Sequence, residues 1–440
     1  MARRQRSREP ETASIESATH DGRGIAATDG KKVFVAGALP GETVRYKRRK
    51  SRRNFDEAEL LEVLEPSPAR VDARCDVFGR CGGCSLQHVT GEAQRELKSR
   101  ALQDSFERIA RVTPDAWLDP MTGPEWHYRR RARLAVKEVL AKGRVLVGFR
   151  ERHAPFITDM HRCEVLEQPV DALMDPLSEL IGSLSIRARL PQVEVAVADN
   201  AVALVFRVLD PPDPDDLAKF EAFGERHGIR IYLQPGGLDS VALSYPHGAI
   251  EPLYYELPEF DLRIAFDAVG FVQVNAGINR KMVHKAVELL DPQEDDRVLD
   301  LYCGIGNFSL PMARRAAVVL GVEGDARLVR AAAANAALNG IDNAEFRQAD
   351  LSAIDGGEAW LRDGWDLLLL DPARSGAQAV SEHIEQIAPR RIVYVSCHAG
   401  TLARDAGTLV NEKGYRCEAA GIIDMFPHTS HVESIAVFSR

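Results

Sequence analysis

The chain has 440 residues, of which 45% are hydrophobic and 28% are charged, and its formal net charge is −9. This length and composition exclude a small disulfide-stabilised scaffold and a disordered chain, and they predict two or three globular domains. No apolar run is long enough to cross a membrane, and the polar first residues lack the apolar segment of a signal peptide. We therefore expect a cytoplasmic protein.

Positive charge is concentrated in the first part of the chain. Residues 1–53 contain fourteen Lys or Arg and six Asp or Glu, a local charge of +8, which leaves −17 for the rest. We interpret residues 1–12 as a basic disordered tail. The run Arg45–Arg53 lies inside a strand-patterned segment, and its cations favour an anionic partner such as nucleic acid.

Residues 13–67 contain short β-rich runs separated by turn signals such as DGRG and ATDGKK. Several short strands at close spacing are typical of a small β-barrel. The stretch THDGRGIAATDGKKVFVAGALPGETV resembles the TRAM module, an RNA-binding barrel similar to the OB fold. The resemblance implies that the basic run follows a phosphate backbone.

A cluster of cysteines follows the barrel. Cys75, Cys81 and Cys84 have the spacing C-x5-C-x2-C, and a fourth cysteine, Cys163, lies in MHRCEVLE. Because a cytosolic protein keeps its thiols reduced, metal binding, nucleophilic catalysis or packing is favoured over disulfides. Four thiolates can hold zinc or a [4Fe–4S] cluster, and the ligand count alone does not separate the two.

The middle of the chain has a mixed pattern. Residues 91–112 predict one amphipathic helix, and residues 126–265 alternate strand-like runs with turns around one apolar helical stretch at 169–184. The segment WHYRRRARLAV mixes arginines with aromatic residues, a composition that suits phosphates and stacked bases or, equally, paired surface charges. No catalytic pattern is visible in this region.

Beyond residue 280, strands alternate with helices, which predicts a doubly wound parallel sheet. Its first strand ends in DLYCGIGNF, where a glycine pair lets the backbone approach a ligand closely. Acids end the next three strands, at Glu323, Asp350 and Asp371. A single acid could cap a helix, but acids at successive strand ends without a Walker lysine suit an adenosyl ligand. The arrangement resembles the S-adenosylmethionine fold of class I methyltransferases.

Two further segments indicate which atom is methylated. DPARSG lacks the aromatic residue that amine-methylating enzymes of this fold carry there, and the fifth strand ends in Ser396-Cys397. Uracil C5 is too weakly nucleophilic to be methylated unaided; a thiolate that adds to C6 activates it, and a base must then remove the C5 proton. FPHTSHVES offers His428, His431 and Glu433 as bases.

These motifs together resemble the RNA uracil-C5 methyltransferases. DLYCGIGNF, GVEGDARLVRAAAANAALNGI, DPARSG, VSCHAGTLARD, FPHTSHVES and FVQVNAGINRK match the successive family motifs in order. The resemblance implies that Cys397 is the nucleophile and Glu433 the base, with His428 and Arg374 nearby. It also implies these contacts to S-adenosylmethionine: Gln273, Tyr302, Asn307, Glu323, Asp350 and Asp371. The chain departs from the family pattern at His398-Ala399, where Asn-Pro is usual, and in DPAR in place of DPPR.

The family's ribosomal RNA branch carries an iron–sulfur cluster, so the resemblance implies a [4Fe–4S] cluster on Cys75, Cys81, Cys84 and Cys163. It also implies methylation of one uridine of 23S rRNA, the family site being uridine 1939, as naked rRNA or in an early assembly intermediate. We expect a monomer with no membrane partner. The alternatives are a non-catalytic, redox-sensing iron–sulfur RNA-binding protein, a C5-cytosine enzyme, or a C5 methyltransferase of tRNA or another rRNA site.

The expected fold is an α/β class I (Rossmann-like) methyltransferase domain with an N-terminal OB-like TRAM β-barrel and a mixed α+β central iron–sulfur domain. We assign residues 13–67 to the barrel. The central domain is expected to comprise residues 68–90 and 125–265. The methyltransferase domain is expected to comprise residues 91–124 and 266–440.

Overall fold

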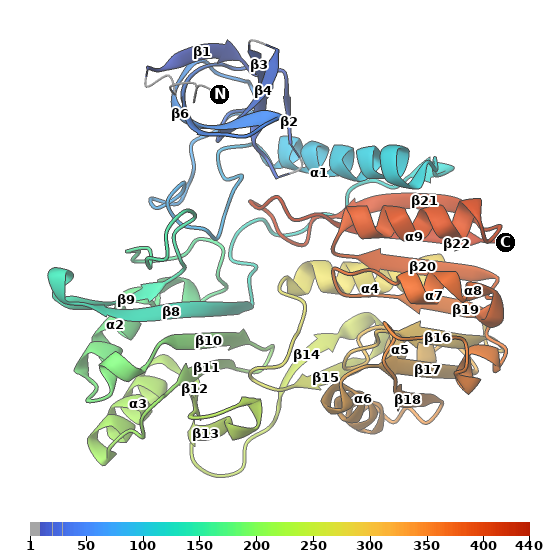
Figure 1. Cartoon of the computed structure of the whole chain (residues 1–440). Coiled ribbons are helices and arrows are strands. Elements are labelled where there is room, and N and C mark those ends of the chain that lie inside the picture. The colour runs from blue at the N-terminus through green and yellow to red at the C-terminus, as the bar shows by residue number, and fades with distance from the viewer. Residues whose placement is uncertain (1–8, 20, 29) are drawn as a thin grey trace. The chain divides into compact units, whose positions relative to one another are not determined.

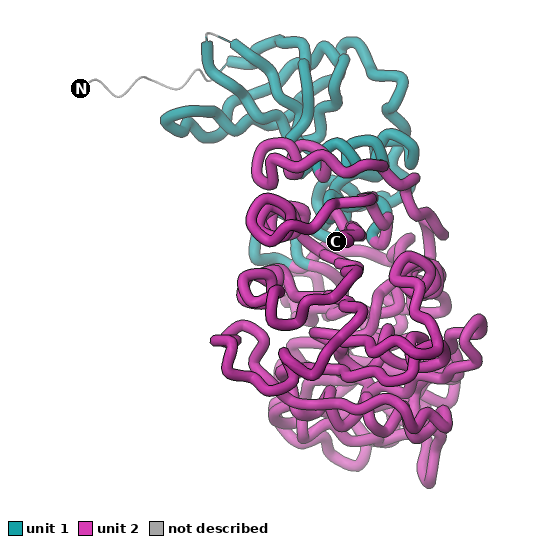
Figure 2. The backbone as a smooth tube through the Cα atoms, turned by 90° about the vertical axis from the view of Figure 1, so that its right-hand side faces the viewer, with its two compact units in different colours: residues 1–101, 150–156, 426–431 teal, residues 102–149, 157–425, 432–440 magenta. Residues whose placement is uncertain are grey.

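The computed structural model describes residues 9–19, 21–28 and 30–440. The chain forms two compact units, which Figure 2 shows in different colours. The first unit comprises residues 1–101, 150–156 and 426–431, and the second comprises residues 102–149, 157–425 and 432–440. Most of the expected basic tail lies outside the described residues. Its last two residues, Glu11 and Thr12, belong to a strand, which corrects the expected start of the barrel.

The first unit contains the expected barrel, a six-stranded sheet in the order β1-β5-β6-β4-β3-β2 that curls on itself (Figure 1). Its strands are β1 (Glu11–Ser14), β2 (Ser17–Ala18), β3 (Gly24–Thr28), β4 (Lys31–Ala36), β5 (Thr43–Ser51) and β6 (Phe55–Glu65). Alternate residues point inward, so that Val33 and Val35 of β4 and Val44 and Tyr46 of β5 are fully buried. The period-two pattern of the sequence therefore produces one apolar core for this barrel.

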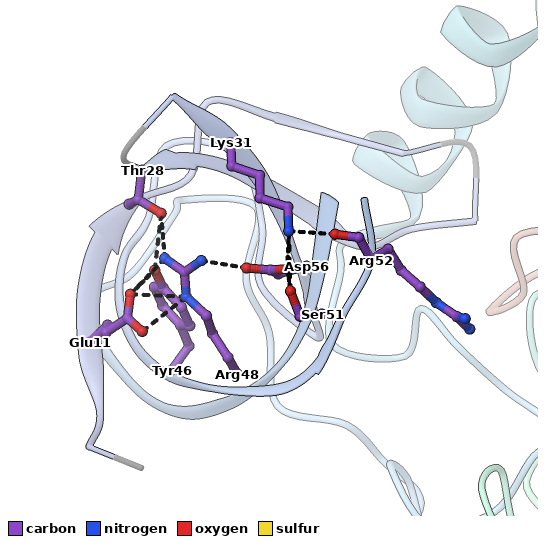
Figure 3. A network of polar contacts seen from close by, with 8 residues as sticks. All are labelled: Glu11, Thr28, Lys31, Tyr46, Arg48, Ser51, Arg52 and Asp56. Carbon is purple, nitrogen blue, oxygen red and sulfur yellow. Dashed lines mark hydrogen bonds and ion pairs between the residues drawn. The ribbon is translucent and has the colours of Figure 1, made fainter. Parts of the chain in front are cut away.

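A network of charged side chains crosses the barrel interior (Figure 3). Arg48 of β5 donates from Nε to Glu11 Oε1 at 2.9 Å and from Nη1 to Asp56 Oδ2 at 2.5 Å. Lys31 of β4 donates to the other oxygen of Asp56 at 2.6 Å. The network joins β1, β4, β5 and β6. Arg48 belongs to the run that was expected to contact nucleic acid. In the structure its side chain instead holds strands of the barrel together.

The rest of the basic run is also partly neutralised. Each of three arginines pairs with a glutamate of β6: Arg45 with Glu62, Arg49 with Glu59 and Arg52 with Glu57. These pairs are largely exposed and are therefore weak, exchangeable contacts. The effective positive charge around the run is therefore smaller than the sequence of the run alone suggests.

The helix expected at residues 91–112 is present. α1 (Gly91–Ser105) continues into a π-helical turn, Phe106–Ala110, and ends at Arg111, whose φ of 54° is left-handed. Phe106 and Ala110 are buried in the second unit against α9 (Ala399–Asn411). The apolar period of the sequence thus continues to the last turn of the helix.

The second unit contains a first sheet in the order β13-β12-β11-β10-β8-β9. Its strands are β8 (Arg131–Val139), β9 (Arg144–Gly148), β10 (Gln192–Val197), β11 (Val202–Arg207), β12 (Ile229–Gln234) and β13 (Ala242–Tyr245). α2 (Met174–Ser183) packs against β9 and α3 (Pro214–His227) against β12. β14 (Leu253–Leu257) and β15 (Leu262–Phe266) form a separate antiparallel pair.

α3 was not predicted, although the residues that begin and end it are recognisable in the sequence. Asp213 caps the helix by accepting the N–H of Asp216 at 2.8 Å, and Pro214 occupies the first turn. Gly228 ends it with a left-handed φ of 65°. The apolar side chains between these signals are few, and the helix was therefore less visible than α2.

The second unit also contains an eight-stranded sheet in the order β18-β17-β16-β19-β20-β22-β21-β7. Its strands are β7 (Ala116–Trp117), β16 (Arg297–Leu301), β17 (Val318–Glu323), β18 (Ala344–Gln348), β19 (Leu367–Leu370), β20 (Arg391–Ser396), β21 (Arg416–Ile423) and β22 (Glu433–Ser439). All pairs from β18 to β20 are parallel, whereas β22 runs antiparallel to both of its neighbours. The doubly wound sheet expected from the sequence is confirmed.

Helices alternate with these strands along the chain. They are α4 (Ala276–Leu290), α5 (Ser309–Ala313), α6 (Ala326–Leu338), α7 (Gln378–Glu382), α8 (Ile384–Ile387) and α9. All four leucines of β19 are buried, as expected for a central parallel strand that is covered on both faces. Among the described residues, no helix combines the length and the apolar character needed to span a membrane.

Candidate active site

Cys397 and Glu433 come together at the carboxyl edge of the eight-stranded sheet. Ser396, the last residue of β20, pairs with Ser434 of β22. Because the two strands are antiparallel, the residue after Ser396 and the residue before Ser434 face each other. These residues are Cys397 and Glu433. β21 ends at the same place, where Ile423 pairs with Glu433.

Two carboxyl groups at this edge resist ionisation. Burial, reinforced by the charge of Asp371 and opposed by that of Arg374, raises the pKa of Glu433 to about 8. Burial likewise raises the pKa of Asp371 to about 7. A carboxyl group that titrates near neutrality can both take up and release a proton, which is what a general base must do.

The thiol of Cys397 is held in its neutral form. Burial is the main cause that raises its pKa to about 11, and the negative charges of Glu433 and Asp371 add to this effect. Arg374 is the cation that opposes it. The same guanidinium therefore favours both the thiolate of Cys397 and the carboxylate of Glu433.

The loop that leaves β16 is shaped to bring its backbone close to a ligand. Tyr302, Gly304 and Gly306 have positive φ angles of 66°, 56° and 93°. Glycine adopts this conformation freely, whereas a tyrosine there is strained, a condition common at ligand sites. Such a loop after the first strand of a doubly wound sheet suits an adenosyl ligand.

Glu323, at the end of β17, organises the adjacent loops. Its carboxylate accepts the N–H of Gly304 at 3.2 Å, of Gly324 at 2.7 Å and of Asp325 at 3.1 Å. These bonds connect the ends of β16 and β17. They fix the carboxylate at the position where ribose hydroxyls are commonly bound in such folds.

Asp350 and Asp371 follow the next two strands but lie in different surroundings. Asp350 is exposed and accepts the N–H and the hydroxyl of Ser352 at 2.9 Å and 2.6 Å, bonds that lower its pKa. Asp350 thus stabilises a local turn, which is the structural role that the sequence also allowed for a single acid. Asp371 is partly buried beside the catalytic candidates.

Asn307 and Gln273 were both expected to contact the cofactor. The side-chain amide of Asn307 exchanges two hydrogen bonds with Asn279, at 3.0 and 3.1 Å, and accepts the hydroxyl of Tyr255 at 2.8 Å. This amide therefore joins the loop after β16 to α4. Gln273 lines a small cavity together with Tyr255, Asn279 and Arg280.

Asp300 is a buried acid whose role sequence reasoning did not resolve. It lies inside β16, fully buried, and accepts the hydroxyl of Ser309 at 2.5 Å, while its other oxygen has no hydrogen-bond partner among the described residues. Burial raises its pKa to about 8, with further contributions from Asp371 and Glu323. The sequence signal for Asp300 is its position within the apolar run RVLDLY, shortly before the glycine loop.

His398 explains how the chain tolerates its departure from the family's Asn-Pro. The Nδ1 atom of His398 accepts the N–H of Thr401 at 3.2 Å and so caps the N-terminus of α9. Asparagine is also a good capping residue. The substitution therefore preserves the start of the helix that directly follows Cys397.

The remaining candidates divide between the two units. Cys75, Cys81 and Cys84 belong to the first unit, whereas Cys163 belongs to the second and is buried. Within residues 9–19, 21–28 and 30–440, no group of three or more His, Cys, Asp or Glu side chains is arranged to hold a metal ion. The expected iron–sulfur ligands therefore stay a prediction.

His428, expected near the base, belongs to the first unit. Its backbone N–H donates to Gln94 Oε1 at 2.7 Å, and its Nδ1 lies 3.2 Å from Gln94 Nε2. Its carbonyl oxygen accepts the N–H groups of Ser85 and Leu86 at 2.8 and 2.9 Å. These contacts give His428 a structural role within that unit.

Comparisons with known proteins agree with this architecture. Residues 256–440 match the family described as tRNA (Uracil-5-)-methyltransferase, and residues 5–61 match the TRAM domain. The crystal structure of the Pyrococcus abyssi tRNA (uracil-54, C5)-methyltransferase in complex with S-adenosyl-L-homocysteine superposes with a TM-score of 0.75. It is 25% identical and covers 97% of this chain and 99% of its own. The barrel and the class I methyltransferase fold expected from the sequence are thereby confirmed.

Two curated relatives are similar along their whole length. The 23S rRNA (uracil(1939)-C(5))-methyltransferase RlmD of Methylococcus capsulatus is 50% identical over 432 residues, 98% of this chain and 97% of that protein. The protein of the same name from Alkalilimnicola ehrlichii is 50% identical over 443 residues, 100% of this chain and 99% of that protein. Identity at this level, continuous through the barrel and the sheet, places the chain in the RlmD family of S-adenosylmethionine-dependent RNA (uracil-C5)-methyltransferases.

Proposed function

We propose that this protein methylates C5 of one uridine in 23S rRNA, at the position that its relatives' names give as 1939, and so forms 5-methyluridine. The observation that carries the proposal is the register of β20 against β22, which sets Cys397 and Glu433 at adjoining strand ends. A thiol and a carboxyl group are the two groups that methylation of a pyrimidine C5 requires.

The two residues act in sequence. The thiolate of Cys397 adds to C6 of the uracil, which gives C5 the character of an enolate. S-adenosylmethionine, when bound, would supply the methyl group that C5 takes up and would leave as S-adenosylhomocysteine. The carboxylate of Glu433 then removes the C5 proton, and the sulfur–C6 bond breaks with return of its electron pair to sulfur. The product leaves with Cys397 restored and Glu433 protonated.

Arg374 and Asp371 adjust this chemistry. Arg374 lowers the pKa values of Cys397 and Glu433, while Asp371 raises them. We assign Arg374 the role of favouring the reactive anionic forms. Asp371 keeps Glu433 basic enough to accept a proton from carbon, because a stronger base takes that proton more readily.

The protein residues fit an adenosyl cofactor. The left-handed loop after β16 and the fixed carboxylate of Glu323 support this assignment. We propose these residues as the binding set: Gln273, Tyr302, Asn307, Glu323, Asp350 and Asp371. Asn307 would contribute mainly by holding the loop against α4, since its amide already bonds to Asn279 and Tyr255.

We further propose that Cys75, Cys81, Cys84 and Cys163 hold a [4Fe–4S] cluster. The support is their spacing and the sulfur of Cys81, which accepts the N–H of Gly83 at 3.4 Å. Hydrogen bonds of this kind stabilise thiolate ligands. Protein purified without oxygen should contain iron and acid-labile sulfide, and Cys84→Ser should lose both. Cys417→Ser, a matched change of a buried thiol in β21, should retain them; iron-free wild-type protein would refute the assignment.

We propose that the chain works as a monomer in the cytoplasm, on naked 23S rRNA or an early assembly intermediate, with the barrel contributing to RNA binding. The proposed contribution of the barrel to RNA binding is supported by its match to the TRAM domain and by the cations of β5. Light scattering of the purified protein, with and without RNA, tests the monomer. A stable dimer in both conditions would contradict it.

The deciding experiment uses S-adenosylmethionine with a labelled methyl group and unmodified 23S rRNA. Digestion should yield labelled 5-methyluridine from a single site, and Cys397→Ala should yield none. Label in a cytidine would point to the C5-cytosine alternative, and label in tRNA alone would contradict the ribosomal substrate. Wild-type protein that binds RNA but labels neither RNA would favour the non-catalytic alternative.

A further inference from the structure

The loop after β19 is clamped at three successive points. It runs from Asp371 to Ala377 and carries both Asp371 and Arg374. The carbonyl oxygen of Arg374 accepts the hydroxyl of Thr401 at 3.2 Å, and that of Ser375 accepts Arg404 Nη2 at 2.9 Å. Thr401 and Arg404 belong to α9, the helix that follows the nucleophile.

The third point is completely buried. The N–H of Ala377 donates to Asp405 Oδ2 at 2.8 Å and to the hydroxyl oxygen of Tyr394 at 3.0 Å. Tyr394 in turn donates its hydroxyl to the same Oδ2 atom at 2.7 Å. Tyr394 is 0% exposed and Asp405 1%. Arg404 completes the arrangement by pairing with Asp405 Oδ1 at 2.7 Å.

The loop backbone packs closely against α9 at this clamp. Gly376 has a φ of 78°, and a Cβ atom there would lie 2.6 Å from Arg404 Nη2 and 2.7 Å from Asp405 Oδ2. The left-handed turn at Gly376 thus brings the loop backbone directly onto α9. Asp405 therefore meets the loop twice, at Gly376 and through its hydrogen bond to Ala377.

We infer that Asp405 and Tyr394 are positioning residues of the methyl-transfer reaction, which hold the loop with Asp371 and Arg374 in place beside the end of β20, where Cys397 follows. Tyr394 lies on β20, three residues before Cys397, and Asp405 lies on α9, which starts just after it. Their shared bond to Ala377 therefore ties the β19 loop to both sides of the nucleophile. The inference rests on the proposed function, because it assigns these residues to that reaction.

Loosening this clamp should change chemistry more than binding. Among the described residues, the acid Asp371 and the cation Arg374 act on the charge of Glu433, and Glu433 acts in turn on the thiol of Cys397. Asp371 adjoins β19, where its N–H donates to the carbonyl oxygen of Leu301 at 3.3 Å, so a loosened clamp should displace Arg374 more than Asp371. When Arg374 moves away, the anionic forms of Cys397 and Glu433 lose a favourable charge and their pKa values rise. The pH profiles of both groups should then shift to higher pH, whereas a simple loss of folded protein would only scale them.

The test compares Asp405→Ala, Tyr394→Phe and Asp405→Asn with the wild type. We expect kcat to fall roughly tenfold to a hundredfold in the first variant, with a much smaller change in KM for S-adenosylmethionine and the rising limb of the pH profile displaced upward. Tyr394→Phe removes one hydroxyl and should show a smaller shift. Asp405→Asn retains an acceptor for Ala377 and should recover part of the rate.

Asp216→Asn is the matched control. Asp216 is also a fully buried carboxylate, but it accepts bonds from Ser185 far from the sheet edge that carries Cys397. The Asp216→Asn variant should have a lower melting temperature but the same pH dependence of kcat as the wild type. A profile that stays in place in Asp405→Ala and Tyr394→Phe, with rates that only follow the folded fraction, would overturn the inference.

A second readout needs no RNA. The rate of alkylation of Cys397 by iodoacetamide, followed by mass spectrometry of its peptide as a function of pH, reports the thiol directly. Asp405→Ala should displace this profile upward, and Asp216→Asn should not. Failure of the proposed function would appear as wild-type protein that methylates no RNA. The alkylation profile would still show whether Asp405 influences the thiol of Cys397.

Discussion

Cys397 directly follows β20 and Glu433 begins β22, so that each adjoins one member of the antiparallel pair Ser396 and Ser434. The reversed direction of β22 is what makes this possible, since it brings the start of the last strand to the edge where the parallel strands end. The nucleophile and the base therefore stand on rigid elements. Their separation depends on backbone pairing, which side-chain substitutions disturb little.

The pH dependence of product release, which requires removal of the C5 proton, should follow Glu433. Its raised pKa of about 8 means that the base form accumulates as pH increases, so the single-turnover rate should rise with pH through this value. Asp371→Asn removes a negative charge that raises this pKa and should move the rise to lower pH. Arg374→Gln removes the opposing cation and should move it to higher pH. Rapid-quench measurements across the neutral range check both directions, and shifts of opposite sign would contradict the assignment.

Substitution of the base should arrest the reaction at the covalent stage. In Glu433→Gln, Cys397 can still add to C6 but the C5 proton cannot leave, so a protein–RNA adduct should accumulate on ordinary uridine RNA. The wild type should form a stable adduct only on 5-fluorouridine RNA. Denaturing gel electrophoresis detects both. Cys397→Ala should form neither, while Cys417→Ala, a buried thiol outside the site, should behave as the wild type.

Glu323 should contribute strongly to cofactor affinity. Glu323→Ala removes the acceptor of three backbone N–H groups and loosens the loop after β16. We expect the Kd for S-adenosylmethionine to increase by about tenfold to a hundredfold, the usual weight of bonds to a charged group. Calorimetric titration measures this. Glu345→Ala, an exposed change on β18, should leave Kd unchanged; equal affinities in both variants would remove Glu323 from the site.

The barrel should be sensitive to acid. Although burial opposes it, hydrogen bonds from Lys31, Ser51 and Arg48 lower the pKa of Asp56 to about 2. A lowered folded-state pKa adds stability above the ordinary carboxyl pKa and loses it as pH falls through the folded value. Asp56 should therefore contribute on the order of 2 kcal/mol that disappears between about pH 4 and about pH 2. Hydrogen exchange of peptides from β3 and β4 follows this loss.

A pair of variants isolates the network. Arg48→Met leaves Glu11 and Asp56 without their shared cation and should destabilise the barrel by about 3 kcal/mol. Arg49→Met breaks an exposed pair with Glu59 and should cost less than about 1 kcal/mol. Similar exchange protection in the two variants would show that the interior network does not stabilise the barrel.

Much of the fold could be predicted because it depends on local patterns. Runs with a period of two predicted the barrel. Alternating strands and helices, with acids at the strand ends, predicted the doubly wound sheet. The clamp could not be predicted, because Asp405 meets Tyr394 and Ala377 across 11 and 28 residues of sequence. Contacts of this kind follow from tertiary packing, and no local pattern encodes them.

The direction in which charged side chains point could not be predicted either. The run that contains Arg45, Arg48 and Arg49 has the same composition whether its side chains point to solvent or into the barrel. Strand register decides which of them do, and it directs Arg48 inward to Glu11 and Asp56. Cys397 and Glu433, in contrast, were visible because each lies beside a recognisable strand end.

The glutamates of β6 change how a polyanion would meet this barrel. Arg45 and Arg49 already have carboxylate partners, Glu62 and Glu59. A phosphate that binds either arginine must displace a carboxylate, so binding there is an exchange of anions in which fewer counterions are released. The ionic-strength dependence of binding should thus be shallower than a count of cations suggests.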